Sequence, residues 1–100
     1  MKTWLVISRG GPNRDLTKGS REQTYWDEHA AFIDGLVDDG FILLGGPFPD
    51  DGGALLVVRA ETEENVLNTM DRDPWYQHGN LVLERVQEWD IFINRMSSGS

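Results

Sequence analysis

Two side chains in this sequence have the chemistry needed for proton transfer, His29 and Asp73. Only two histidines are present, and cysteine is absent. An imidazole has an ordinary pKa of about 6.5, so it can take and give a proton near neutral pH if a partner orients it. Asp73, in the segment DRDPW, could accept a hydrogen bond from one ring nitrogen of His29 and leave the other nitrogen for a substrate. Such a pair would support proton abstraction, tautomerisation or elimination.

Each of these residues also has an ordinary structural explanation. A half-buried histidine is often bonded to a backbone carbonyl inside a core, and an aspartate before a proline commonly ends a helix. The second histidine, His78 in YQHGN, is interpreted as a surface turn residue. The aromatic neighbours of the pair, Trp26 and Trp75, could wall a pocket or could simply pack in the core.

Other candidates for ligand binding flank the predicted strands. Arg9 and Arg14 follow the first strand and could bind a carboxylate or phenolate, although exposed arginines are usually only solvated. The segment GGPFPDDGG lacks the Lys-Ser/Thr ending of a phosphate loop, so we predict a turn in which Gly45 and Pro47 shape a pocket rim. Two distant histidines without cysteine and without a calcium-loop pattern disfavour a metal site. We also expect no cofactor, because no cofactor motif is present.

The composition limits the class of protein. A chain of 100 residues, 39% of them hydrophobic, can form one domain with a modest core. Its net charge of −8 disfavours nucleic acid as a partner, because phosphate binding needs a clustered basic surface. No apolar run is long enough for a membrane span, and MKTWLVISRGG becomes polar too early for a secretory signal, so we expect a cytoplasmic setting. We assign residues 1–96 to a single domain and SSGS at 97–100 to a disordered tail or cloning scar.

The elements that must position these residues follow from periodicity and turn signals. β-branched and aromatic runs bounded by Gly, Pro, Asn and Asp predict strands, and stripes spaced by three and four residues predict helices. The predicted order is a strand at 2–8, a helix at 21–39 ended by Gly40, a hairpin of 41–46 and 53–60, a helix at 61–70 capped by Thr62, and a strand with an extension at 80–93. The order βαββαβ predicts an α+β, ferredoxin-like sandwich: a four-stranded antiparallel sheet with two helices on one face.

Two surfaces of this predicted fold bear on function. On the first helix, His29 lies within or beside an apolar stripe that includes Trp26, Ile33 and Leu36, so it should face the core side. In the first strand, Trp4 and Val6 point one way while Leu5 and Ile7 point the other, so the helix-free sheet face is apolar as well. A second copy of the same sheet would bury that face, which predicts a homodimer.

Residues 2–94 resemble the YCII-related (YciI-like) domain family. The residues that carry the resemblance are the helix WDEHAAFIDGLVDDGF with His29, LLGGPF at 43–48, DRDPW at 71–75, and Trp89. The resemblance implies a dimeric α+β barrel in which His29 and Asp73 form the active-site pair. One branch of the family is similar to enzymes that remove chloride from hydroxylated, chlorinated aromatic compounds, and the wider group includes isomerases and monooxygenases that need no metal or flavin. The long loop after the first strand and the aromatic residues Trp26 and Trp75 depart from the commonest pattern, which leaves the substrate class open.

Together these observations predict a cofactor-independent small-molecule enzyme of lyase, isomerase or dehydrochlorinase type, acting on a small organic substrate, aromatic compounds included. His29 and Asp73 would be catalytic. The predicted substrate-binding residues are Trp26, Pro47, Trp75 and Arg9. The alternative is a non-catalytic small-molecule-binding or accessory domain, and a further one is that the pair only stabilises the fold. Substitution of His29 would cost turnover in an enzyme, affinity in a binder and stability in the last case.

Overall fold

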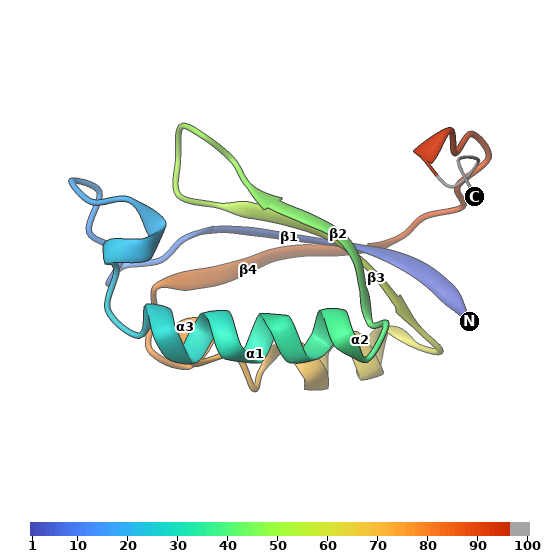
Figure 1. Cartoon of the computed structure of the whole chain (residues 1–100). Coiled ribbons are helices and arrows are strands. Elements are labelled where there is room, and N and C mark those ends of the chain that lie inside the picture. Colours follow the sequence, from blue (N-terminus) through green and yellow to red (C-terminus); the bar gives the residue numbers. More distant parts are fainter. Residues whose placement is uncertain (97–100) are drawn as a thin grey trace.

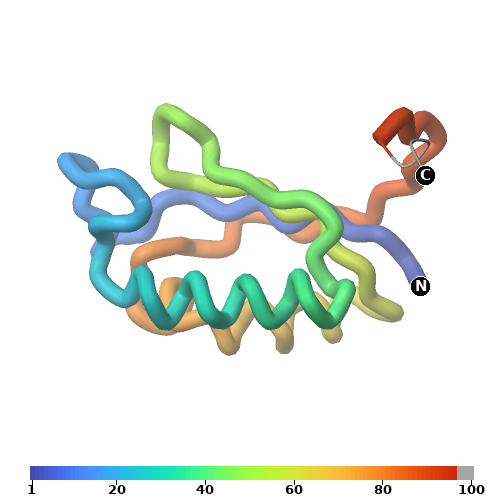
Figure 2. The backbone as a smooth tube through the Cα atoms, viewed as in Figure 1, coloured from blue at the N-terminus to red at the C-terminus, as the bar shows by residue number. Residues whose placement is uncertain are grey.

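Four strands form one antiparallel sheet in the order β2-β3-β1-β4 (Figure 1), in a computed structural model that describes residues 1–96. The expectation for residues 97–100 lies outside this part of the chain. The strands are β1 (Lys2–Gly10), β2 (Ile42–Pro47), β3 (Ala54–Ala60) and β4 (Leu81–Glu88). Two main helices, α1 (Trp26–Asp38) and α2 (Glu63–Met70), cover one face of the sheet, and Figure 2 shows the same two layers. The predicted α+β, ferredoxin-like architecture is confirmed.

Strand β1 lies inside the sheet and alternates as predicted. Trp4, Val6 and Ser8 are buried towards the helices, whereas Leu5 and Ile7 lie on the opposite face. Val6 is fully buried among core residues from every layer, and the Trp4 indole donates a hydrogen bond to the Ala60 carbonyl at 3.0 Å. Ser8 is a polar residue in an otherwise apolar row, and it belongs to the candidate active site.

The first helix begins later than the sequence predicted. Residues Ser20–Glu22 form a 3₁₀ turn, and Tyr25 takes a left-handed conformation with φ 63°, which interrupts the helix before Trp26. The buried side chain of Gln23 fixes this turn, because its amide accepts from the Asp15 backbone N–H at 2.9 Å and donates to the Asp15 carbonyl at 2.7 Å. The predicted helix at 21–39 is therefore wrong at its start. The hydrogen bonds between the Gln23 side chain and the preceding loop outweigh the helix propensity of this segment.

The end of α1 and the following hairpin agree with the prediction. Gly40, with φ 79°, ends the helix in a Schellman motif, in which the Phe41 N–H donates to the Leu36 carbonyl at 2.9 Å. Strands β2 and β3 then pair as a hairpin whose tip contains Gly52, with φ 76°. Helix α2 starts at the predicted cap, since the Thr62 hydroxyl accepts from the Asn65 N–H at 3.1 Å.

The segment after α2 departs from the prediction at one point. A short helix, α3 (Pro74–Gln77), begins within the DRDPW segment, where the sequence had indicated only the end of a helix. Strand β4 ends at Glu88, and the Trp89 N–H, at the start of the predicted extension, donates to the Thr3 carbonyl at 2.9 Å. Beyond Trp89, Phe92 is largely exposed because no neighbouring strand covers it.

Candidate active site

Asp73 is positioned by the start of α3. As the residue before Pro74 it has an extended backbone, and its side chain caps the helix by accepting from the Trp75 N–H at 2.9 Å. Proline at the first helical position needs no hydrogen-bond acceptor for its nitrogen, which suits this sharp start. The carboxylate is almost completely buried, so it requires compensating donors.

His29 supplies the second donor from the first turn of α1. Its Nδ1 lies 2.8 Å from Oδ1 and 2.9 Å from Oδ2 of Asp73. The side chains of His29 and Asp73 are 13% and 1% exposed. Because an ionised carboxylate only accepts hydrogen bonds, this contact favours the tautomer with its proton on Nδ1. The other ring nitrogen, Nε2, makes no hydrogen bond to residues 1–96 and is available to a ligand.

Two indoles lie against the imidazole, Trp75 on its face and Trp26 in a tilted arrangement with ring centroids 5.9 Å apart. The ring of Trp75 stacks on that of His29 with centroids 3.7 Å apart and planes at 9°, and Trp26 lies 5.8 Å from Trp75 in a tilted arrangement. Trp75 is itself fixed, because its Nε1 donates to the Thr24 carbonyl at 2.8 Å. The imidazole therefore has one ring edge on a carboxylate and one face on an indole, which leaves it little rotational freedom.

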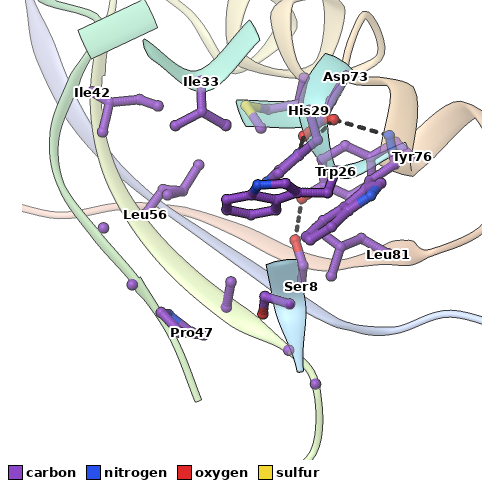
Figure 3. Close-up of a pocket in the computed structure, with 18 of the residues that line it drawn as sticks. Ser8, Trp26, His29, Ile33, Ile42, Pro47, Leu56, Asp73, Tyr76 and Leu81 are labelled. Carbon is purple, nitrogen blue, oxygen red and sulfur yellow. Dashed lines mark hydrogen bonds and ion pairs between the residues drawn. The ribbon is translucent and has the colours of Figure 1, made fainter. Parts of the chain in front are cut away.

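A second polar pair lies beside the first. The hydroxyl groups of Tyr76, on α3, and Ser8, on β1, share a hydrogen bond (Figure 3). Burial raises the pKa of Tyr76 and the nearby Asp73 carboxylate raises it further, whereas the bond to Ser8 lowers it, and the net direction is upwards. Tyr76 is therefore a protonated hydroxyl near neutral pH and can donate a hydrogen bond to a ligand oxygen.

These groups line one cavity of about 390 Å³ between α1, α3 and the sheet. Figure 3 shows His29, Tyr76 and Ser8 at one end of it, with apolar side chains such as Ile33 and Leu56 along its length. A cavity of this volume suits a small organic molecule.

The residues predicted from the sequence are largely brought together. His29, Asp73, Trp26, Trp75 and Pro47 all line this cavity. Gly45, predicted at the rim, lines it as well.

Arg9 is placed elsewhere. Its side chain is exposed and follows Leu5 and Ile7 on the helix-free face, because β1 continues to Gly10 and keeps alternating. The arginines that do line the cavity are Arg14 and Arg21, from the loop between β1 and α1.

Ser8, Tyr76 and Arg21 were not singled out from the sequence. The one usable signal was Ser8, a polar residue on the buried side of an apolar strand. His78 is an exposed residue at the end of α3 that stacks on Tyr25 with centroids 3.9 Å apart, which agrees with its interpretation as a surface turn residue.

Neither a metal-binding cluster nor a membrane-spanning helix is found within residues 1–96. Within residues 1–96, no three His, Cys, Asp or Glu side chains are grouped so that they could hold a metal ion. None of the helices described there has the length and apolar character needed to cross a membrane.

Comparison with known proteins identifies the family and the fold of the chain. Residues 3–90 match the model of the YCII-related domain, and the chain belongs to that family. Among solved structures, it is similar to the 5-chloro-2-hydroxyhydroquinone dehydrochlorinase of Burkholderia phenoliruptrix AC1100, determined in complex with 2,5-dihydroxybenzoquinone. The TM-score is 0.67 at 23% sequence identity, covering 87% of this chain and 93% of the other, which shows that the two chains share the same α+β fold. No curated protein matches the sequence.

Proposed function

We propose that this protein is a cofactor-independent enzyme that uses His29 as general base and acid, oriented by Asp73, on a small hydroxylated aromatic compound. The observation that carries the proposal is the asymmetric placement of the imidazole. Its Nδ1 is held by both oxygens of a buried carboxylate, whereas Nε2 has no hydrogen-bond partner within residues 1–96 and the residue lines the cavity. This arrangement prepares one nitrogen, and only one, for proton transfer.

The neighbouring side chains fit a planar, oxygenated substrate. Trp26, Ile33 and Leu56 offer apolar surface to a ring, and Tyr76 offers a hydrogen-bond donor to a ring oxygen on which negative charge develops. The similarity to a dehydrochlorinase with a dihydroxybenzoquinone ligand supports the same substrate class. At 23% identity that similarity supports the class of chemistry without identifying the compound.

The reaction proposed is loss of hydrogen halide from a halogenated hydroxyquinol. His29 Nε2 takes a proton from one ring hydroxyl and returns it to the carbon that bears the halogen, which gives the keto tautomer. Loss of a second hydroxyl proton to Nε2 then pushes the O–H electron pair through the ring and expels halide with the carbon–halogen pair. The sum is a quinone, a proton and a halide ion, so no oxidant or reductant is consumed.

The test is chloride release from 5-chloro-2-hydroxyhydroquinone under argon, measured for the wild type and for His29→Asn. Asparagine places an amide where Nδ1 was, so buried Asp73 keeps a donor while the reactive Nε2 is removed. We expect the turnover rate to fall by about 100-fold or more. His78→Asn is the matched control, because it removes the only other histidine, which is exposed and does not line the cavity.

Two outcomes would contradict this proposal. Equal chloride release by the wild type and His29→Asn, with the fold of the variant checked by ¹H–¹⁵N NMR, would remove His29 from the reaction. If the wild type shows neither chloride release nor deuterium uptake at the ring carbons of hydroxyquinol, the protein is a non-catalytic binding domain and the proposal is wrong.

We also propose that the chain acts as a homodimer formed through the helix-free sheet face. The pairing register places Leu5 beside Val57 and Ile7 beside Leu55. On the edge strand β2, Leu44 pairs with Val57. All five side chains lie on this face, and Leu44 is 48% exposed. An apolar sheet face of this kind is normally covered, and the same apolar face of a second copy would cover it.

A further inference from the structure

Two arginines line the cavity without a partner of their own. Arg14 is half-buried and Arg21 is exposed, and both come from the loop between β1 and α1. Among residues 1–96, neither guanidinium has an ion-pair or hydrogen-bond partner. The chain has 17 acidic residues and only 9 basic ones, so cations without an ion-pair partner are unexpected at a cavity wall. Their positive charge lies at the edge of a lining that is mostly apolar.

The side chain of Arg14 lies directly against the backbone of two glycines, Gly10 and Gly52. Its Cδ and Nε atoms lie 2.5 and 2.4 Å from where a Cβ on Gly52 would be, and its Cδ lies 3.2 Å from the corresponding position on Gly10. Any larger residue at position 52 would occupy the space of this side chain. The glycines at positions 10 and 52 therefore leave the space that the Arg14 side chain occupies at the cavity wall.

Nearby acidic residues are engaged elsewhere. The Asp51 carboxylate accepts from the Gly53 N–H at 2.9 Å and makes no ion pair with Arg14. Lys18 pairs with Asp15 at 3.9 Å, so a cation on the same loop is neutralised while Arg14 is not. An unpaired, positioned guanidinium is the group that proteins use to bind carboxylates and other planar anions.

We propose that the cavity binds an aromatic anion whose carboxylate or phenolate lies on Arg14, with Arg21 adding to the positive field. The inference rests on the proposed function for the reacting end of that ligand. The buried Asp73 carboxylate lies at the His29 end and repels a second negative charge, so the anionic group of the ligand points away from it and towards Arg14. The aromatic ring then lies between them, on Ile33 and Leu56.

The experiment compares benzoate with benzamide, two planar probes of the same size that differ in charge. Dissociation constants come from ¹H–¹⁵N NMR titrations of the wild type, Arg14→Gln, Arg21→Gln and Arg9→Gln. We expect benzoate to bind the wild type more tightly than benzamide does. Arg14→Gln should weaken benzoate by about 10-fold, and exposed Arg21→Gln by about 3-fold, with benzamide unchanged. Arg9→Gln removes the same charge from the opposite sheet face and should leave both constants unchanged.

The proposal would be overturned by equal binding of the two probes, by equal effects of Arg14→Gln and Arg9→Gln, or by the lack of any shift of cavity resonances with benzoate up to its solubility. These outcomes are separate from those of the chloride-release assay, since binding is measured without turnover and with His29 intact. If Arg14→Gln leaves benzoate binding unchanged while the wild type releases chloride, the anion site is disproved and the proposed enzyme activity stands.

Discussion

The imidazole of His29 lies flat on the indole of Trp75, with ring centroids 3.7 Å apart, while Asp73, two residues before that indole, binds its Nδ1. One short segment therefore fixes both the face and the edge of the imidazole. In the proposed reaction this ring must carry a proton between two steps, and both contacts keep it in one orientation.

Asp73→Asn should abolish most turnover while leaving the fold in place. Asparagine still caps α3, so the free energy of unfolding should change by about 1 kcal/mol or less. Its NH₂ group, however, donates towards Nδ1, which moves the ring proton to Nε2 and removes the basic lone pair from the cavity. We expect chloride release to fall by about 100- to 10,000-fold. The ¹⁵N chemical shifts of His29 should report the change of tautomer, and unchanged shifts would contradict the assigned geometry.

Tyr76→Phe should change how stability depends on pH. The pKa of Tyr76 is raised above 10.0 in the folded protein, chiefly by burial. The folded state therefore keeps a proton that the unfolded chain loses, so this contribution to stability is complete below pH 10.0 and declines as the pH rises through the folded value. Urea unfolding at about pH 8 and about pH 11 should show a larger loss in the wild type than in Tyr76→Phe. An equal loss in the two proteins would show that Tyr76 is not the group responsible.

Gly52→Ala should disturb both the hairpin and Arg14. The left-handed backbone at this position, with φ 76°, costs a residue with a Cβ about 1–2 kcal/mol, and the added atom would also collide with the arginine side chain. We expect a lower free energy of unfolding together with weaker benzoate binding. Gly40→Ala is the matched control, since this glycine has the same left-handed backbone, with φ 79°, but its Cβ would meet no atom within 4 Å and it does not line the cavity. An equal loss of benzoate binding in both variants would argue against the contact between Gly52 and Arg14.

Leu55→Lys should convert a dimer into a monomer. Lysine in the middle of the helix-free face would leave a charge buried between two sheets, which an interface of this kind does not tolerate. Sedimentation velocity should give twice the chain mass of 11.3 kDa for the wild type and the single mass for the variant. Asn68→Lys, an equal change of charge on the exposed side of α2, should remain dimeric. A monomeric wild type at micromolar concentration would contradict the dimer.

The parts of the fold that could be predicted depend on local patterns. Alternation in β1 separated Val6 from Ile7, and helical spacing placed His29 on the inner side of α1. Thr62 followed by acidic residues indicated the start of α2, because capping and helix dipole act within one turn. These signals need no knowledge of the tertiary structure.

The parts that could not be predicted depend on contacts between distant residues. The late start of α1 follows from Gln23 binding the loop at Asp15, and the Ser8–Tyr76 pair joins residues 68 positions apart. Arg9 was predicted to bind substrate because the first strand was expected to end at Ser8. Strand β1 continues two residues further, so Arg9 belongs to the strand and Arg14 to the loop at the cavity. A difference of that size in a strand boundary moved the candidate arginine to the opposite face.

The segment Asp73-Pro74-Trp75 begins a helix, orients the His29 imidazole and anchors the preceding loop through Thr24. The fold needs these three contacts whether or not the protein is an enzyme. The Tyr76 hydroxyl makes none of these contacts, and within residues 1–96 its one hydrogen-bond partner is Ser8. Among relatives that share this fold, exchange of tyrosine for phenylalanine at this position is therefore the better marker of a change in chemistry.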